Sequence, residues 1–280
     1  MAEIIDGKKI AQEILCDLKQ SIRQMPEKPG LAILLIGDDE ASHVYVKLKK
    51  KAGEECDIGI YLYLFPTDVE EKNIMAMIDF LNHDPEIDGI IVQLPLPHGF
   101  DEDTIIRAID PAKDVDGFHP QNLEALTHKK PRIISGLALG IVRLIHATNV
   151  DLAGKNAIII SNHSVFAEPI RYLLELEGVK VNALKSSAKN LKKATQTADI
   201  LIVAVGKKYF VKKSWVKNGS IIIDVGINRL RNKKIVGDVD DTAGEKAAFI
   251  TPVPGGVGPM TVAMLLYNTY TLALTKRSKQ

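Results

Sequence analysis

Residues 157–169, AIIISNHSVFAEP, hold the pattern that decides the fold of this 280-residue chain. The apolar run Ile158–Ile160 ends in a short polar turn, and a helix-like stretch, Ile170–Glu177, follows. A second apolar run begins after Gly178. This order of strand, turn, helix and strand is typical of a β-α-β nucleotide-binding unit. The glycines that usually line the turn of such a unit are absent here.

The same alternation extends along the chain. Apolar, strand-like runs separated mostly by helix-like stretches are Leu31–Ile36, Ile60–Phe65, Gly89–Leu94, Ala157–Ile160, Val179–Leu184, Ile200–Val205 and Ser220–Val225. Strands that alternate with helices predict parallel sheets covered by helices on both faces. We therefore expect an α/β fold.

Two stretches carry signals for the start of a helix. Asp6 precedes apolar residues at helical spacing, so we expect it to cap the first helix. Thr67 and Glu70 have the spacing of a capping box, ahead of an apolar stripe that begins at Ile74.

The elements form two groups, which predicts two domains. The first domain covers residues 1–118 and the second covers 138–255. A closing helix, expected over 260–280, returns to the first domain. It follows TPVPGGVGPMT (251–261), whose glycines and prolines predict neither helix nor strand, although Pro259 suits the first turn of the closing helix.

The composition excludes several classes of protein. A net charge of +1 gives no long-range attraction to nucleic acid or to a membrane surface. Cys16 and Cys56 are too few for a disulfide framework, and no Cys/His cluster has zinc spacing. The start, MAEIIDGKKI, lacks the pattern of a secretion signal, and no run of about 18 apolar residues occurs. We expect a cytoplasmic protein without a metal site.

The stretch HVYVKLKKKAGEE presents a phenol and an amine together. Tyr45 and Lys49 are four residues apart and share a face if the stretch is helical. The phenol can orient the amine or pass it a proton through water. The same spacing also arises by chance, as a half-buried tyrosine beside a surface lysine, so this pair alone leaves both interpretations open.

Two further motifs place polar side chains beside strand ends or turns. In DGIIVQLPLPHG, Gln93 lies at the carboxyl end of a predicted strand, where open parallel sheets bind ligands. In KDVDGFHP, Asp114 and Asp116 lie in a turn, where aspartates usually bond their own backbone. These residues are candidate substrate ligands or, in the alternative, a polar strand cap and an ordinary turn.

Seven motifs in order, YVKLKKK, DGIIVQLPLP, KDVDGFHP, IVAVG, IIIDVGIN, VGDV and TPVPGGVGPMT, resemble the bifunctional methylenetetrahydrofolate dehydrogenase/methenyltetrahydrofolate cyclohydrolase family. The resemblance implies an N-terminal α/β folate domain, a Rossmann-like NAD(P) domain and a cleft between them. It implies that NADP oxidises methylenetetrahydrofolate and that water converts the methenyl product to formyl-tetrahydrofolate. It also implies a homodimer that acts on tetrahydrofolate-derived small molecules in one-carbon metabolism and purine biosynthesis.

The resemblance also implies roles for individual residues. Lys49 matches the essential lysine, Tyr45 its partner, and Gln93 the glutamine that hydrogen-bonds the lysine. Asp116 matches the aspartate that holds the pterin ring. Other expected substrate contacts are Leu94, Pro95, Pro254, Gly255 and Gly256, and expected cofactor contacts are Ser161, Asn162, His163, Ser186 and Ile227.

Chemistry gives Lys49 a specific task. The methenyl carbon is cationic and electrophilic, so the enzyme must bring water to it and remove a proton. A neutral amine can do this if burial or nearby positive charge lowers its pKa. Gln93 carries no charge and can aim the amine without raising that pKa.

The nucleotide turn departs from the family pattern G-x-S-x-x-V-G-x-P. Ser161 and Ala167 replace its two glycines and His163 replaces its serine, while Pro169 is retained. Side chains at the glycine positions restrict positive φ and close approach of the backbone to phosphate. Upstream, SGLA (135–138) replaces P-C-T-P. A second hypothesis is therefore a cyclohydrolase with weakened or lost dehydrogenase activity.

The segment after Val179–Leu184 favours NADP over NAD. No acidic residue follows to bind the ribose hydroxyls; Lys185, Ser186 and Ser187 follow, and they suit a 2′-phosphate. NAD stays open, because lysine and serine are also common exposed residues after a strand.

A third hypothesis is a non-catalytic folate or nucleotide binder. The presence of Lys49 argues against it, because a binding protein has little use for this amine.

Overall fold

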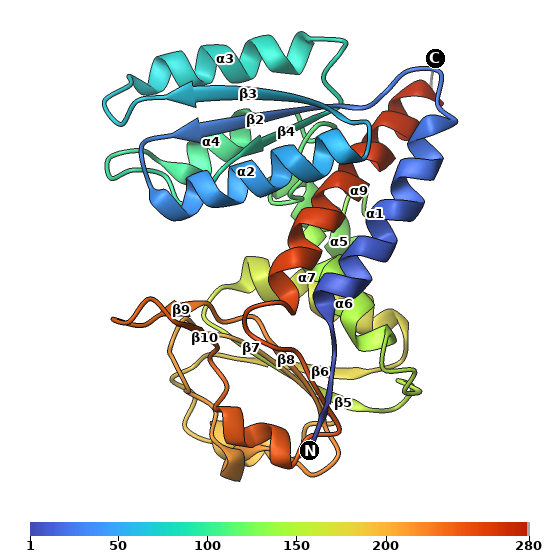
Figure 1. Cartoon of the computed structure of the whole chain (residues 1–280), viewed down its shortest axis with the longest axis vertical. Helices are drawn as coiled ribbons and strands as arrows, with labels where there is room; N and C mark the ends of the chain where they lie inside the picture. The colour runs from blue at the N-terminus through green and yellow to red at the C-terminus, as the bar shows by residue number, and fades with distance from the viewer. Residues whose placement is uncertain (279–280) are drawn as a thin grey trace. The chain divides into compact units, whose positions relative to one another are not determined.

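The computed structural model describes residues 1–278, which form two compact units. Unit 1 comprises Met1–Ala11 and Leu137–Thr261, and unit 2 comprises Gln12–Gly136 and the chain from Val262 onward. Each unit is built on a parallel sheet, which confirms the predicted α/β class (Figure 1). Residues 279 and 280, which the prediction included in the closing helix, lie outside the described residues.

Unit 2 holds a three-stranded parallel sheet in the order β3-β2-β4. Its strands are β2 (Gly30–Ile36), β3 (Gly59–Phe65) and β4 (Gly89–Val92). Its helices are α2 (Glu40–Glu55), α3 (Glu71–His83), α4 (Glu102–Ala108) and α5 (Pro120–Thr127), with most of α1 (Gly7–Arg23) and of α9 (Val257–Arg277). All the predicted strands of this unit are present, with ends shifted by two residues or fewer.

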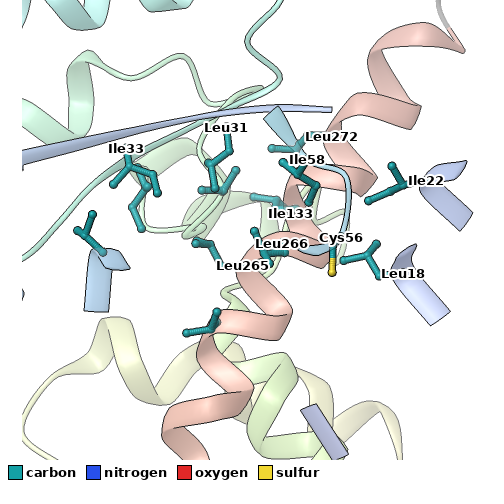
Figure 2. Packing of buried hydrophobic residues seen from close by; sticks show 14 of the residues in the cluster. Leu18, Ile22, Leu31, Ile33, Cys56, Ile58, Ile133, Leu265, Leu266 and Leu272 are labelled. Atoms are coloured by element: carbon teal, nitrogen blue, oxygen red, sulfur yellow. The ribbon is translucent and has the colours of Figure 1, made fainter. Parts of the chain in front are cut away.

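The central strand β2 explains why helices cover both faces of this sheet. Every residue of β2 is buried, and successive side chains point to opposite faces. One face packs with α1, α2 and α9, through Leu31, Ile33, Leu35, Leu18, Val46 and Leu266 among others. Figure 2 shows part of this cluster. The opposite face packs with α3 and α4, through Ala32, Leu34, Ile36, Ile74 and Ile105 among others.

Unit 1 holds a six-stranded parallel sheet in the order β1-β11-β8-β7-β5-β6. The strands are β1 (Glu3–Ile4), β5 (Asn156–Ser161), β6 (Lys180–Leu184), β7 (Ile200–Ala204), β8 (Ile221–Asp224) and β11 (Phe249–Ile250). Other elements are α6 (Gly136–His146), α7 (Ser164–Leu176), α8 (Leu191–Thr195), η1 (Lys213–Trp215), η2 (Asp241–Glu245) and the hairpin β9 (Asn228–Arg229) and β10 (Ile235–Val236). The strand order reverses at β5, which has β6 on one side and β7 on the other.

The structure tests the two predicted helix starts. The prediction that Asp6 caps the first helix is confirmed, because its carboxylate accepts a hydrogen bond from the Lys9 N–H at 3.0 Å as α1 begins. The capping box of Thr67 and Glu70 is wrong: Glu70 itself is the N-cap of α3 and its side chain makes no capping bond.

Two other boundaries differ from the prediction. Helix α7 begins at Ser164, six residues before the predicted start at Ile170, and it contains Pro169. A proline there removes only the hydrogen bond to the carbonyl of Val165, a residue exposed to water. Helix α9 begins at Val257, so the last five residues of the segment predicted to be irregular are helical. No helix in the described part of the chain combines the length and apolar character that a membrane span needs.

Two buried aspartates tie together the loops at the carboxyl edge of the sheet in unit 1. The Asp238 carboxylate accepts hydrogen bonds from the three N–H groups of residues 205–207 at 2.6, 2.9 and 2.8 Å. The Asp224 carboxylate accepts from the N–H groups of Gly226, Asp238 and Val239 at 2.9, 3.0 and 2.9 Å. Burial raises the pKa of Asp224 to about 6 despite these bonds. The loops after β7 and β8 are therefore held by carboxylates.

This arrangement requires glycine at position 237. A Cβ added at Gly237 would lie 1.8 Å from the Asp224 Oδ2. We expect Gly237→Ala to destabilise unit 1 by about 1–3 kcal/mol, the usual result of overpacking. Urea unfolding followed by the fluorescence of Trp215, the single tryptophan, reports on this unit.

Gly244→Ala is the matched control, because a Cβ there meets nothing closer than 3.9 Å. Its urea midpoint should stay near that of the wild type. Equal midpoints for the two variants would contradict the packing argument at Gly237.

Candidate functional site

Lys49 is a buried amine in unit 2. It lies on α2, and only 9% of the residue is exposed. Its Nζ donates a hydrogen bond to the Gln93 Oε1 at 2.8 Å. Burial lowers the pKa of Lys49, and the charge of Asp116 opposes that shift without reversing it. Since the direct partner is neutral, it adds no charge that would raise the pKa of the amine.

Gln93 is held in place by its own backbone and side chain. It directly follows β4, and its N–H donates to the carbonyl of Leu34 at 2.9 Å, which extends the pairing with β2. Its Nε2 donates to the carbonyl of Leu94 at 2.7 Å. With the amide nitrogen so engaged, the amide oxygen faces Lys49. The Leu94–Pro95 peptide that follows is cis.

Asp116 differs from its neighbour Asp114. The Asp114 carboxylate accepts hydrogen bonds from the N–H groups of Gly117 and His119, at 3.0 and 2.8 Å, and from the Asn122 Nδ2 at 3.0 Å. These bonds fix the turn, as expected for a turn aspartate. The Asp116 carboxylate makes no hydrogen bond to any residue within 1–278, so its acceptor capacity is free for a ligand.

Electrostatics link Asp116 to the amine. Although part of the residue reaches the surface, desolvation raises the pKa of Asp116 to about 6; the positive charge of Lys49 lowers it and Asp114 raises it. A small pocket adjoins Asp116, with Ile90, Leu94 and Phe118 among its lining residues. Asp116 and Asp114 are the polar residues in this otherwise apolar lining.

Tyr45 lies one turn before Lys49 on α2 and is half-buried. Burial raises the pKa of Tyr45, so its phenol remains protonated at neutral pH and can donate a hydrogen bond. Helix α2 is well anchored at its start, where Asp39 accepts from the Ser42 N–H at 2.7 Å. Among the predicted catalytic residues of unit 2, the structure shows a direct hydrogen bond between Lys49 and Gln93.

The expected substrate residues Pro254, Gly255 and Gly256 belong to unit 1. They form the turn before α9, in which the Gly256 N–H donates to the Pro252 carbonyl at 2.9 Å. The Gly255 carbonyl accepts from the Lys8 N–H at 3.0 Å. A Cβ at Gly256 would lie 2.7 Å from the Thr251 Cβ, so the turn has room only for glycine there.

The nucleotide turn of unit 1 is closed by local hydrogen bonds. Ser161 ends β5, and its Oγ accepts from the His163 N–H at 3.2 Å and donates to the His163 carbonyl at 3.3 Å. Ala167 is 4% exposed, so its added methyl group is buried. Asn162 reaches across to Ser186, whose N–H and Oγ both donate to the Asn162 Oδ1 at 3.1 and 3.0 Å.

Unit 1 nevertheless fits a dinucleotide such as NADP. The reversal of strand order at β5 marks the crevice where open parallel sheets bind nucleotides. His163, the N-cap of α7, makes no side-chain capping bond, which leaves first-turn N–H groups available to an anion. Ile227, which follows β8, is 54% exposed near the same sheet edge.

Sequence reasoning missed two features of unit 1. The Asp224–Asp238 pair lies in the motifs DVGIN and VGDV, and the recurrence of aspartate beside glycine was the available signal. The bond between Asn162 and Ser186 had no sequence signal, because it depends on the register of β5 against β6.

Comparison with known proteins covers both units. The family model described as the tetrahydrofolate dehydrogenase/cyclohydrolase catalytic domain matches residues 5–116, and the model of the corresponding NAD(P)-binding domain matches 135–277. The bifunctional protein FolD of Bacillus subtilis is 44% identical over 272 residues, which are 96% of each chain.

Solved structures agree with this likeness. The bifunctional FolD methylenetetrahydrofolate dehydrogenase/cyclohydrolase of Campylobacter jejuni matches with a TM-score of 0.93 and 40% identity, over 99% of this chain and 100% of that one. The Trypanosoma brucei FolD, complexed with NADP cofactor and inhibitor, matches with a TM-score of 0.91 and 31% identity, over 100% and 99%.

The neutral character of Gln93 predicts a titration effect. We expect Gln93→Glu to raise the pKa of Lys49 by about 1 unit or more, because a carboxylate stabilises the ammonium form. The measurement is an NMR titration of protein labelled with ¹³C at the lysine Cε, in which loss of a signal in Lys49→Met identifies Lys49.

Lys113 is an internal control in the same titration. It is also buried, but its Nζ donates to the carbonyls of Leu81 and Asp84, both at 2.8 Å, so its signal should titrate unchanged. A Lys49 signal that titrates identically in wild type and Gln93→Glu would exclude the proposed influence of Gln93.

Proposed function

Because the chain belongs to the tetrahydrofolate dehydrogenase/cyclohydrolase family, we propose that it oxidises methylenetetrahydrofolate with NADP and hydrolyses the methenyl product to formyl-tetrahydrofolate. The observation that carries the proposal is the buried amine of Lys49, bonded to the neutral oxygen of Gln93. On this assignment residues 1–118 with the closing helix are the folate domain, and 138–255 are the nucleotide domain.

Lys49 acts in the hydrolytic step as general base. Water adds to the cationic methenyl carbon, and the neutral Lys49 amine takes the proton that this water loses. The positive charge of the substrate further disfavours the ammonium form until that proton arrives. The proton then passes to the ring nitrogen as its bond to the carbon breaks, and the hydroxyl on that carbon loses its remaining proton to solvent as the carbonyl of the formyl product forms.

The neighbours of Lys49 orient the reactants. Gln93 fixes the direction of the amine through its 2.8 Å bond. Tyr45 supplies a protonated phenol beside it. The free carboxylate of Asp116 accepts hydrogen bonds from the N–H groups of the pterin ring, while Leu94 and Pro95 provide apolar contact.

The oxidative step places different demands on the chain. NADP, when bound, supplies the acceptor for the hydride. The chain needs no acid or base for this step and has only to hold the reacting groups in place. We assign this task to the carboxyl edge of the sheet in unit 1, with nucleotide contacts from Ser161, His163 and Ile227 and a 2′-phosphate contact from Ser186, beside which Asn162 lies.

We further propose a cytoplasmic homodimer that supplies formyl-tetrahydrofolate to one-carbon reactions, including purine biosynthesis. The free thiols of Cys16 and Cys56 suit a reducing compartment. Strand β3 is an edge strand and exposes Tyr61 and Leu64, an apolar edge that a second copy can cover.

A cyclohydrolase without dehydrogenase activity is the second candidate. The observation that favours it is the pair of side chains at Ser161 and Ala167, where the family pattern has glycines. Calorimetric titration with NADP and with NAD separates the two functions, because micromolar binding of either nucleotide excludes the second candidate.

We expect Lys49→Ala to reduce cyclohydrolase turnover by about 10²–10⁴-fold, the usual contribution of a positioned general base. Folate affinity should change little, since Asp116 is intact. The measurement combines the rate of methenyl-tetrahydrofolate hydrolysis with calorimetry of tetrahydrofolate binding.

Lys51→Ala is the control, because Lys51 is an exposed lysine on the same helix. Turnover by Lys49→Ala equal to that of Lys51→Ala would remove Lys49 from the mechanism. Absence of hydrolysis by the wild-type protein would instead favour a binding protein that performs no catalysis.

The raised pKa of Asp116 predicts pH-dependent binding. The ionised carboxylate is the acceptor, and with a pKa of about 6 its ionised fraction falls about tenfold for each pH unit well below 6. We expect tetrahydrofolate affinity, measured anaerobically by calorimetry, to fall between pH 7 and pH 5. In Asp116→Asn the affinity should be lower and nearly flat over this range. A flat profile in the wild type would exclude ionised Asp116 as the acceptor.

A further inference from the structure

We propose that Asn162 sets the nucleotide preference of unit 1 by occupying the hydrogen-bond donors of Ser186 that a 2′-phosphate needs. The inference rests on the proposed function, because it assumes that the unit binds a dinucleotide. Asn162 directly follows β5 and Ser186 follows β6 by two residues. Since β5 and β6 are paired neighbours, their carboxyl ends lie side by side.

The end of β6 is where the ribose of the adenosine half is recognised. In a β-α-β nucleotide unit, the residues after the second strand contact this ribose, with an acidic residue for NAD and a basic one for NADP. Here the second strand is β6, and Lys185, Ser186 and Ser187 follow it. Lys185 and Ser187 are exposed and Ser186 is half-buried, so Ser186 is the better-fixed donor for a 2′-phosphate.

In the structure both donors of Ser186 are already in use. Its N–H and its Oγ point at one atom, the Asn162 Oδ1, at 3.1 and 3.0 Å. A carboxamide oxygen accepts about two hydrogen bonds, so this oxygen is saturated. The neutral Asn162 oxygen thus lies where an oxygen of a 2′-phosphate would take the same two bonds.

Asn162 and the phosphate therefore compete. Charge-assisted hydrogen bonds to phosphate are roughly twice as strong as neutral ones, so NADP displaces the amide oxygen but loses part of the affinity in doing so. NAD carries a 2′-hydroxyl and does not require these donors, so its affinity is unaffected. The hydrogen bonds between Asn162 and Ser186 thus reduce the ratio of NADP affinity to NAD affinity by several-fold to about tenfold.

Calorimetric titration of the full chain with NADP and with NAD tests the proposal. In Asn162→Ala the dissociation constant for NADP should fall about five- to tenfold, while that for NAD stays within about twofold. Ser186→Ala should weaken the binding of NADP and leave the binding of NAD unchanged. The double variant should match Ser186→Ala, because no donor remains to be released.

Two further variants sharpen the result. Asn190→Ala is the matched control, since Asn190 is an exposed asparagine in the same segment without a capping bond, and neither constant should change. Asn162→Asp is the second test, needed if Asn162→Ala does not fold. Its carboxylate holds the Ser186 donors more firmly and repels phosphate. The affinity for NADP should therefore fall about tenfold or more, and the affinity for NAD should fall less.

The outcomes separate this proposal from the proposed function. A ratio of the two constants that is unchanged in Asn162→Ala, or that shifts toward NAD, overturns the role of Asn162 alone. A wild-type protein that binds neither nucleotide overturns both this proposal and the dehydrogenase activity, while hydrolysis of methenyl-tetrahydrofolate stays intact.

Discussion

A primary amine buried beside a neutral amide is the interaction on which the site in unit 2 depends. Burying an ammonium ion is unfavourable unless a carboxylate lies in contact with it, and then the amine is no longer a base. Lys49 avoids both outcomes, because Gln93 satisfies one of its hydrogen bonds without adding charge. Asp116 influences Lys49 through space, yet desolvation remains the larger effect on the pKa of the amine. The lowered pKa of Lys49 is therefore produced by packing.

The fold supplies that packing through one strand. Every residue of β2 is buried, and β2 holds β4 in register from Leu31 to Leu34, which places Gln93 one residue beyond the pairing. The face of β2 that carries Leu31 and Ile33 also packs with Val46 of α2, the helix that bears Lys49. In unit 1 the same kind of sheet edge is organised by carboxylates, since Asp224 and Asp238 accept backbone N–H bonds. Carboxylates thus accept the backbone N–H groups of the loops in unit 1, while a neutral amide oxygen accepts from the buried amine of Lys49 in unit 2.

The sequence predicted those parts of the fold that depend on local pattern. The strands of four or more residues are mostly apolar runs, so their composition identified them within two residues. Strands β1 and β11 were not predicted. Each is only two residues long, too short to show a period, and their pairing joins distant parts of the chain. The capping box failed because Glu70 took the N-cap position itself. Contact between Lys49 and Gln93 came from the family resemblance; nothing in the spacing of residues 44 apart indicates it.

The two reactions respond differently to sequence change in this chain. The residues proposed for water addition, Lys49, Gln93 and Asp116, all lie in unit 2, and burial within this unit shifts the pKa values of Lys49 and Asp116. The nucleotide site proposed for hydride transfer includes the turn after β5, in which Ser161 and Asn162 form hydrogen bonds to the protein's own backbone and side chains. A nucleotide that uses the same donors has to displace these bonds. We therefore expect a change in that turn to alter the affinity for nucleotide and to leave the hydrolytic step in unit 2 unchanged.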